Sequence, residues 1–296
     1  MSHLSSLVMR NIRIFYRTKW NVFFAFMAVI ILVVLHFAIF RNMNTDSWAN
    51  MFIEYGIDRL YFQWLVDSMM FAAIIPIGAV SMSLTALEPI VKDKEIGSLS
   101  DFLVAPIKRT SLMVSYLASS FVVCFVLLLA IILFYKVYFF AFYGILFTAY
   151  QFLIILMVLL GSIVFANVFM LLLLSFLKTQ SGMSAVGSIV GTMIGFLAGA
   201  YIPLGIFGDF VRNLFSALPF AQLTTLSRQA FFHNLENVTP FTADMFGGNM
   251  GMTWGLTLWL GESEIPTWGI AAMTAAVTVL AAVVLVYRFR RMNKED

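Results

Sequence analysis

Charged residues and cysteine are scarce in this sequence. Only 11% of its 296 residues are charged and 61% are hydrophobic, whereas a soluble domain has about 25% charged and about 45–50% apolar residues. No water-soluble fold could bury so much apolar surface, so the composition predicts that lipid is the solvent for much of the chain. The single cysteine, Cys124, lies in an apolar run. It excludes an intramolecular disulfide and argues against redox chemistry or a cysteine-based metal site.

The chain also lacks the motifs of nucleotide hydrolysis, metal binding and ion coupling. No Gly-x-x-x-x-Gly-Lys-Ser/Thr loop and no Gly-Lys pair occurs, so we do not expect ATP hydrolysis by that route. The histidines His3, His36 and His233 are scattered without metal-ligand spacing. Asp67 and Glu88 lie near opposite ends of the second predicted span. We therefore expect no carboxylate deep in the membrane, which disfavours a carrier driven by protons or sodium.

Long apolar runs dominate what is present. A helix that crosses the hydrocarbon core needs about 20 apolar residues. The fourth run covers 143–176, which is long enough for one tilted helix or two short ones. The predicted spans are 20–40, 62–87, 111–135, 145–176, 183–202 and 266–287.

The basic residues decide between these alternatives. With a single fourth span, 13 of the 18 lysines and arginines fall on the side of the N-terminus and 5 on the other side. Splitting the fourth run would move Lys178 and the C-terminal basic residues to the other side, which the positive-inside rule disfavours. We therefore predict an all-α integral membrane protein with six transmembrane helices. Both termini are expected in the cytoplasm, in the plasma membrane of a bacterium.

Residues 1–19 form an amphipathic pattern. Arg10, Arg13 and Arg17 share one face of a helix, and apolar residues share the opposite face. The pattern predicts an interfacial helix that lies in the membrane surface. The alternative is a cytosolic stub with a chance pattern. The apolar face contains Leu4, Leu7, Val8, Ile12, Ile14 and Phe15.

The outer segment 203–265 follows the fifth predicted span. Its first half, from Pro203 through Pro219 to Arg228, is apolar and aromatic but carries charges, so it is a poor simple span. Irregular backbone at membrane depth must be buried in protein or line a cavity. We therefore predict a re-entrant or interfacial outer helical hairpin before the last span, followed by an exposed loop.

The fifth predicted span has a glycine at every fourth position. Small residues at this spacing allow close approach of helices in lipid. Two interpretations remain open, namely tight packing within one subunit and a helix that lines the pathway or a subunit interface. Gln151, Ser162 and Asn167 in the fourth span are likewise either structural hydrogen-bonding groups or ligand contacts. The four glycines are Gly187, Gly191, Gly195 and Gly199.

The loop 88–110 joins the second and third spans and is the most informative stretch. It opens with mixed charges that include Asp93 and Glu95, and Gly97 follows. Ser98 is suited to cap a short helix, and Pro106 would end it. Such a helix either presents its apolar face to a partner or packs under its own bundle. That face contains Leu99, Phe102 and Leu103.

This loop resembles the first cytoplasmic loop of ABC-2 type transporter permeases, in the branch of drug and antibiotic exporters. The family pattern is roughly Glu-Arg-Glu-x-Gly-Thr-Leu-Glu-x-Leu-Leu-x-x-Pro, and here residues 92–109 match it, with Ser98 in place of Thr and Ser100 in place of Glu. A second match is a Gly, a later hydrophobic-Pro pair, and a Pro that opens a segment running to an Arg. These residues are Gly199, Ile202, Pro203, Pro219, Phe220 and Arg228.

The resemblance covers essentially the whole chain and implies a function. It implies the transmembrane permease subunit of an ATP-driven ABC exporter that moves a hydrophobic or amphipathic substrate, such as a drug, antibiotic, peptide or lipid-like molecule. The chain itself would not be an enzyme, because ATP and Mg would bind to two copies of a separate ATP-binding subunit. A second permease chain would complete a homodimer or heterodimer among membrane lipids, with no nucleic acid.

The resemblance also assigns a coupling role to loop 88–110. Its short helix would dock into the ATP-binding subunit and carry its motion to the bilayer. The alternatives are a secondary carrier or channel not driven by ATP, and an integral membrane enzyme acting on lipids. The residues expected to couple are Asp93, Glu95, Gly97, Ser98, Leu99, Phe102, Leu103 and Pro106.

Overall fold

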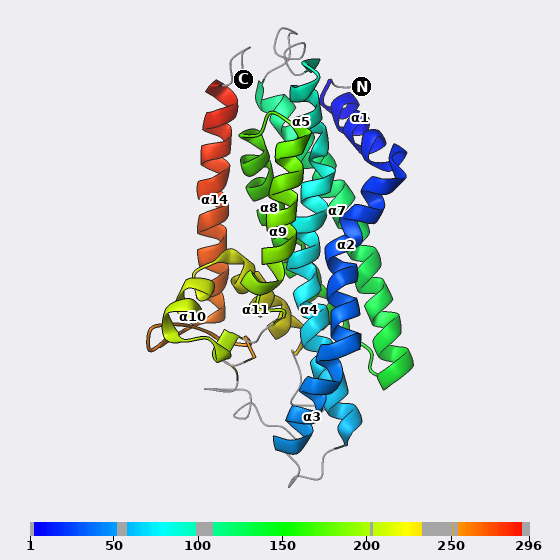
Figure 1. Cartoon of the computed structure of the whole chain (residues 1–296), viewed down its shortest axis with the longest axis vertical. Helices are drawn as coiled ribbons and strands as arrows, with labels where there is room; N and C mark the ends of the chain where they lie inside the picture. Colours follow the sequence, from blue (N-terminus) through cyan, green and yellow to red (C-terminus); the bar gives the residue numbers. More distant parts are fainter. Residues whose placement is uncertain are drawn as a thin grey trace.

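The structure is a bundle of long helices that run roughly side by side (Figure 1). This computed structural model describes residues 3–51, 58–98, 109–201, 204–232, 251 and 254–291. Within those residues, five helical stretches are long and apolar enough to cross a membrane. The protein is therefore an all-α membrane protein. The five stretches are Lys19–Asn50, Arg59–Glu95, Arg109–Tyr143, Ala149–Ser175 and Thr267–Arg291.

Residues 3–51 form a bent chain of helices. Helix α1 (His3–Arg17) is followed by α2 (Lys19–Leu35), a short π-helix η1 (His36–Phe40) and α3 (Arg41–Met51). The predicted first span ends at residue 40, but the helix continues through the π-helical turn to residue 51. A π-helical segment inside an α-helix is often found at a functional site.

Helix α4 (Arg59–Ala86) is the centre of the bundle, and α5 (Glu88–Glu95) continues from it. Asp58 caps α4 by accepting a hydrogen bond from the backbone N–H of Leu60 at 3.0 Å. Helix α4 packs against α2, α7, α8 and α11, so most of its residues are buried. A helix that is apolar on all sides belongs in the core of such a bundle.

Helices α7 (Arg109–Tyr143) and α8 (Ala149–Ser175) form the next pair. Helix α7 extends eight residues beyond the end predicted at 135. Between the two helices Gly144 has a φ of +68°, a conformation that favours glycine. Thr148 then caps α8 by accepting from the N–H of Gln151. The fourth predicted region is thus one helix of 27 residues with a short turn before it.

Helix α9 (Gln180–Leu197) corresponds to the predicted span 183–202. It is not among the five candidate spans, since glycine, serine and threonine dilute its apolar residues. Its 18 residues would extend for about 27 Å. It begins beside α5 and ends beside α11 (Figure 1).

The chain then forms a compact cluster at one end of the bundle. It contains the 3₁₀ turn η3 (Leu204–Ile206), α10 (Asp209–Ser216) and α11 (Pro219–Phe231), followed by a hairpin of β1 (Leu258–Leu260) and β2 (Ser263–Ile265). The hairpin is antiparallel, with Trp259 opposite Glu264. Helix α11 packs against α4, α8 and α14, so it is buried on nearly every side.

Helix α14 (Thr267–Arg291) returns along the bundle to the end where α1 begins (Figure 1). We call this end, which also holds α5, the α5 end, and the opposite end, which holds α3, α10 and α11, the α11 end. Of the 16 lysines and arginines in the described residues, eleven lie at or near the α5 end.

Candidate functional site

A buried aspartate joins three helices at the α5 end. Asp93 on α5 is only 2% exposed. Its carboxylate accepts hydrogen bonds from Arg10 Nη1 at 2.8 Å, from Arg10 Nη2 at 2.6 Å and from the Tyr116 hydroxyl at 2.7 Å. The hydrogen bond to Asp93 raises the pKa of Arg10 above its ordinary value. Because these residues lie on α1, α5 and α7, the cluster ties the surface helix to the bundle.

The last turn of α5 is held from another side. Lys94 Nζ donates to the backbone carbonyls of Ser175 at 2.5 Å and Leu177 at 3.2 Å. The Glu95 carboxylate accepts from the backbone N–H of Gln180 at 3.2 Å. Helix α5 is therefore fixed to the turn between α8 and α9 as well as to α1 and α7.

The predicted coupling helix follows directly after this fixed turn. Gly97 has a φ of +81°, where an L side chain would be strained, and it is exposed. Ser98 itself has helical conformation. The remaining predicted coupling residues lie outside the described part of the chain. They are Leu99, Phe102, Leu103 and Pro106.

Part of the apolar face of helix α1 packs against the helix bundle. Leu7, Asn11 and Phe15, spaced four residues apart, are buried, and α1 packs on α7. Arg13 and Arg17 are exposed, as expected for the polar face of an interfacial helix. Arg10 instead reaches Asp93, so the three arginines do not share one environment.

A groove of about 740 Å³ separates α2 from α9. Its floor is formed by α4 residues that include Leu84 and Thr85, and aromatic residues of α2 such as Phe24 form one wall. Gly187 and Gly191 lie on the opposite wall. No described atom outside α9 lies within 4 Å of the position a Cβ would take at Gly191. Gly191 therefore leaves open space in the groove, whereas a Cβ at Gly187 would lie 3.3 Å from Leu84 of α4.

The other two glycines of the stripe have different roles. A Cβ at Gly195 would lie 2.1 Å from the ring of Tyr201, so the absence of a side chain lets this ring fold against the helix. Gly199 lies beyond the end of α9, with a φ of +63°. The regular spacing therefore does not correspond to one continuous packing face.

The polar residues of the fourth span make internal hydrogen bonds. Gln151 Nε2 donates to the Phe231 carbonyl at 2.6 Å, which fixes α11 to α8. Ser162 donates to the Val158 carbonyl of its own helix. The side-chain oxygen of Asn167 accepts from the Ser120 hydroxyl on α7. These contacts lie within the bundle, while Asn167 Nδ2 is buried without a partner among the described residues.

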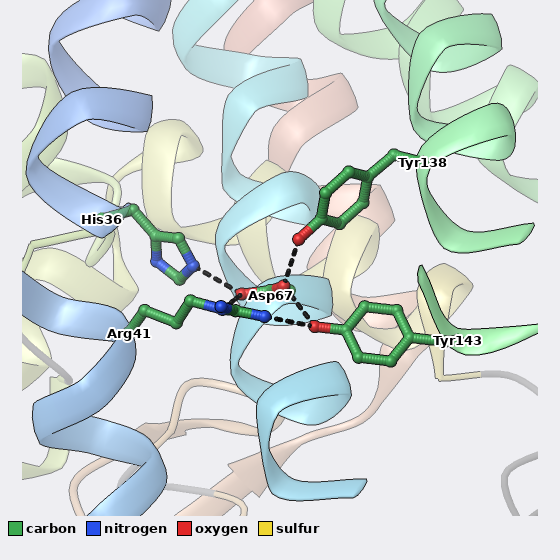
Figure 2. A network of polar contacts seen from close by, with 5 residues as sticks. All are labelled: His36, Arg41, Asp67, Tyr138 and Tyr143. Atoms are coloured by element: carbon green, nitrogen blue, oxygen red, sulfur yellow. Dashed lines mark hydrogen bonds and ion pairs between the residues drawn. The ribbon is translucent and has the colours of Figure 1, made fainter. Parts of the chain in front are cut away.

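A buried network around Asp67 was not anticipated from the sequence (Figure 2). The Asp67 side chain is completely buried, although the sequence suggested a residue near a helix end. Its carboxylate contacts His36 Nε2 at 2.8 Å and Arg41 Nε at 3.1 Å. It accepts from the hydroxyls of Tyr138 at 2.8 Å and Tyr143 at 2.5 Å, and Arg41 Nη2 donates to Tyr143 at 2.9 Å.

This network connects three parts of the chain far apart in sequence. His36 and Arg41 come from the consecutive helices η1 and α3, Asp67 from α4, and the two tyrosines from the last turns of α7. Asp67 is therefore buried in protein, and the expectation that no carboxylate lies deep in the membrane stays a prediction. Arg41, Tyr138 and Tyr143 lie beyond the predicted ends of the first and third spans, whereas His36 lies within the first predicted span.

Arg228 forms a second buried polar site. It lies in the last turn of α11, the helix that begins at Pro219. It is 4% exposed, and its Nη1 and Nη2 donate to the carbonyls of Trp254 and Gly199 at 2.9 and 2.8 Å. Burial lowers the pKa of Arg228 to about 10, so it remains positively charged at neutral pH. Pro203, the other predicted hairpin residue, lies outside the described residues.

No group of three or more potential metal ligands is present among the described residues. The long apolar helices, with their exposed apolar faces, define a multi-pass membrane protein. The sequence model of a family described as ABC-2 family transporter protein matches residues 41–286. The chain therefore belongs to the ABC-2 transporter family, whose members are transport subunits and not catalysts. No curated protein matches the chain.

Proposed function

We propose that this chain is the permease subunit of an ATP-driven exporter of hydrophobic or amphipathic molecules. The match to the ABC-2 transporter family over 41–286 carries this proposal. The sequence has no phosphate-binding loop, so ATP and Mg bind to a separate ATP-binding subunit, present in two copies.

Six crossings and a cytoplasmic α5 end follow from the topology and charge. The chain leaves α8 at the α5 end and reaches α10 and α11 at the α11 end, so α9 crosses the bilayer as a sixth span. Its length of about 27 Å suits a hydrocarbon core of about 30 Å. Most lysines and arginines lie at or near the α5 end, which the positive-inside rule assigns to the cytoplasm.

Force enters the permease at the α5 end. The segment 97–106 leaves a helix that is fixed to α1, α7, α8 and α9 through Asp93, Lys94 and Glu95. A push from the ATP-binding subunit on this segment is therefore shared among five helices and is not absorbed by a loose loop. In this mechanism Asp93 and Glu95 hold the lever, while Leu99, Phe102 and Leu103 contact the partner.

The groove between α2 and α9 faces a second permease chain and forms one wall of the transport path. The exposed face of α9 carries Ser184, Ser188 and Thr192, whose hydroxyls donate to backbone carbonyls of their own helix. An apolar and aromatic wall opposite these small residues suits an amphipathic molecule. A homodimer or a heterodimer with a sibling permease satisfies this geometry.

A secondary carrier remains the alternative function, and one observation favours it. The His36–Asp67 pair is an ionisable pair buried within the helix bundle, and carriers driven by protons require an ionisable group inside the membrane. The carboxylate of Asp67 is already occupied by four donor groups, however, which suits a structural role better than repeated proton binding.

The test is co-purification with the product of a neighbouring reading frame that contains a phosphate-binding loop. We expect mass spectrometry to show two ATP-binding subunits with two permease chains, and ATPase activity that depends on the permease. The double variant Leu99→Ala, Leu103→Ala should lose this activity, whereas Leu214→Ala, an exposed leucine at the α11 end, should keep it. Transport that continues without ATP and follows a proton gradient would support the carrier instead.

A further inference from the structure

Arg228 is a buried cation without a carboxylate partner among the described residues. Its two hydrogen bonds to described residues go to backbone carbonyls, which carry only partial charge. Its Nε has no hydrogen-bond partner there. A guanidinium has five N–H groups, so three are left without an acceptor among the described residues. Burying a charge is costly unless it is paired, and an ionisable group inside a membrane protein marks a functional site by default.

Two glycines in the left-handed conformation hold the guanidinium. Gly199 has a φ of +63° and supplies one of the carbonyls, and Gly255 has a φ of +67°. A Cβ at Gly255 would lie 2.4 Å from Arg228 Nη1. The backbone therefore approaches the guanidinium more closely than any other residue type would permit. This arrangement fixes one side of the guanidinium and leaves the Nε side without a partner.

A small cavity of about 40 Å³ lies beside Arg228. A water needs about 10–15 Å³ by this kind of measure, so the cavity holds about three waters or one compact polar group. His36, Asn44, Tyr201 and Trp254 line it, and none of its described lining residues is acidic. The nearby carboxylate of Asp67 is saturated by its own donors (Figure 2).

The cavity continues the line of the groove between α2 and α9. The groove extends along α2 as far as Ile31 and along α9 as far as Ile194. The cavity begins at the next residue of α2, Leu32, and at Gly199 beyond the end of α9. An extended molecule with its apolar part in the groove and its head beyond Ile31 and Ile194 would reach toward the cavity beside Arg228.

We propose that the cavity beside Arg228 binds a compact anionic group, such as a carboxylate. The source is either the head of an amphipathic cargo molecule whose tail lies in the groove, or a free inorganic anion. The cargo version rests on the proposed function and narrows its substrate class to amphipathic anions. The binding itself is a property of this chain alone.

The experiment measures binding of radiolabelled dodecanoate to the full-length chain in nanodiscs of zwitterionic lipid. Empty nanodiscs give the background. Unlabelled dodecanoate should compete, while dodecanol and dodecyltrimethylammonium, with the same tail and a neutral or cationic head, should not. Competition by chloride or inorganic phosphate at millimolar concentration, without a requirement for the tail, would assign the site to a free anion. Equal competition by dodecanol and dodecanoate, with no effect of either inorganic anion, would overturn the proposal.

Variants at position 228 test whether the Arg228 guanidinium binds the anion. Arg228→Gln should weaken binding of the anion about tenfold to a hundredfold, as expected for lost hydrogen bonds from a charged donor. The control Arg59→Gln, an exposed arginine paired with Asp46, should bind like the wild type. Arg228→Lys keeps the charge without the two-pronged geometry and should be intermediate. If Arg228→Gln does not fold, the comparison of head groups on the wild type still decides. Wild-type affinity in a folded Arg228→Gln chain would overturn the proposal, and because no ATP-binding subunit is needed, this outcome is independent of the exporter assignment.

Discussion

The network around Asp67 permits a quantitative test of how the helices at the α11 end are held together. Asp67→Asn keeps the side-chain volume and removes the charge, which leaves Arg41 beside a neutral amide. Breaking a buried ion pair by removing one partner costs about 3–5 kcal/mol in soluble proteins. Single hydrogen bonds between membrane helices average only about 0.6 kcal/mol. Because Asp67 accepts from four groups and is completely buried, the larger figure applies, and we expect a loss of about 3 kcal/mol.

The contribution of Tyr143 follows from a double-mutant cycle. Tyr143→Phe removes the bond to Asp67 and the bond from Arg41, so its cost should be about 2 kcal/mol. In the Asp67→Asn background the same change should cost about 1 kcal/mol less, because the charged acceptor is already gone. Tyr135→Phe on the same helix is the matched control. The Tyr135 hydroxyl is buried with no partner among the described residues, so its removal should be neutral or stabilising.

The assay is thermal unfolding of the purified protein in detergent. The fraction of protein that stays monodisperse is measured as the temperature rises. At about 2–4 °C per kcal/mol for a domain of this order of size, Asp67→Asn should lower the midpoint by roughly 6–12 °C. Additive effects of Asp67→Asn and Tyr143→Phe would refute the reasoning. A loss for Tyr135→Phe equal to that for Tyr143→Phe would refute it as well, since a general effect of hydroxyl removal would then explain both.

Three further predictions use matched pairs. Arg10→Gln should remove the link from α1 to Asp93, cost about 2 kcal/mol and reduce ATPase coupling in the assembled transporter, whereas the exposed Arg13→Gln should leave both unchanged. Gly255→Ala combines a left-handed φ with a clash against Arg228, so it should lower the unfolding midpoint strongly. Its control, Gly261→Ala, has a similar φ but open space and should lose only about 1 kcal/mol. Equal unfolding midpoints for the two variants would contradict the close approach of the Gly255 backbone to Arg228. Gly191→Leu adds a side chain to the groove at a position where no described atom lies within 4 Å of the new Cβ, so unfolding should change by less than about 0.5 kcal/mol while transport and pairing fail. Gly161→Leu, an exposed glycine on α8, is its control, and normal transport by Gly191→Leu would show that the groove is not on the path.

The membrane class and the family were predictable because they depend on composition and on local motifs. Apolar runs near the bilayer thickness identify helices without knowledge of their partners. The position of Pro219 at the first turn of α11 also follows from local chemistry, since proline has no N–H to leave unsatisfied there.

The two buried polar sites could not be predicted, because they depend on helix ends and on contacts between distant segments. Hydropathy placed the end of the third span at 135, since Lys136 interrupts the apolar run. Helix α7 continues to Tyr143, and Lys136 lies over the ring of Phe152 at 5.7 Å. A signal was nevertheless present in the sequence. Tyr138 and Tyr143 are five residues apart, and aromatic residues with a polar tip are typical of the membrane boundary.

The central helix links the α5 end to both polar sites. Helix α4 has 28 residues, or about 42 Å, and passes into α5 with a single intervening residue. Its far portion carries Asp67 and the cavity residues Val66, Met69 and Met70. If α4 behaves as a rigid rod, motion imposed on α5 reaches the Asp67 network and the Arg228 cavity together. Pro76 is the weak point, since a proline inside a helix removes one backbone hydrogen bond and often causes a kink.

Spin-label distances distinguish a rigid rod from a hinge at Pro76. One pair at Leu60 and Ile96, which are 48% and 63% exposed, reports the length of α4 and α5. A second pair at Phe24 and Ser184 reports the width of the groove between α2 and α9. With a non-hydrolysable ATP analogue bound to the assembled transporter, we expect the groove distance to change while the first distance stays constant. A change in the Leu60–Ile96 distance that disappears in Pro76→Ala would show that α4 bends, and the α5 end would then move without carrying the Asp67 network with it.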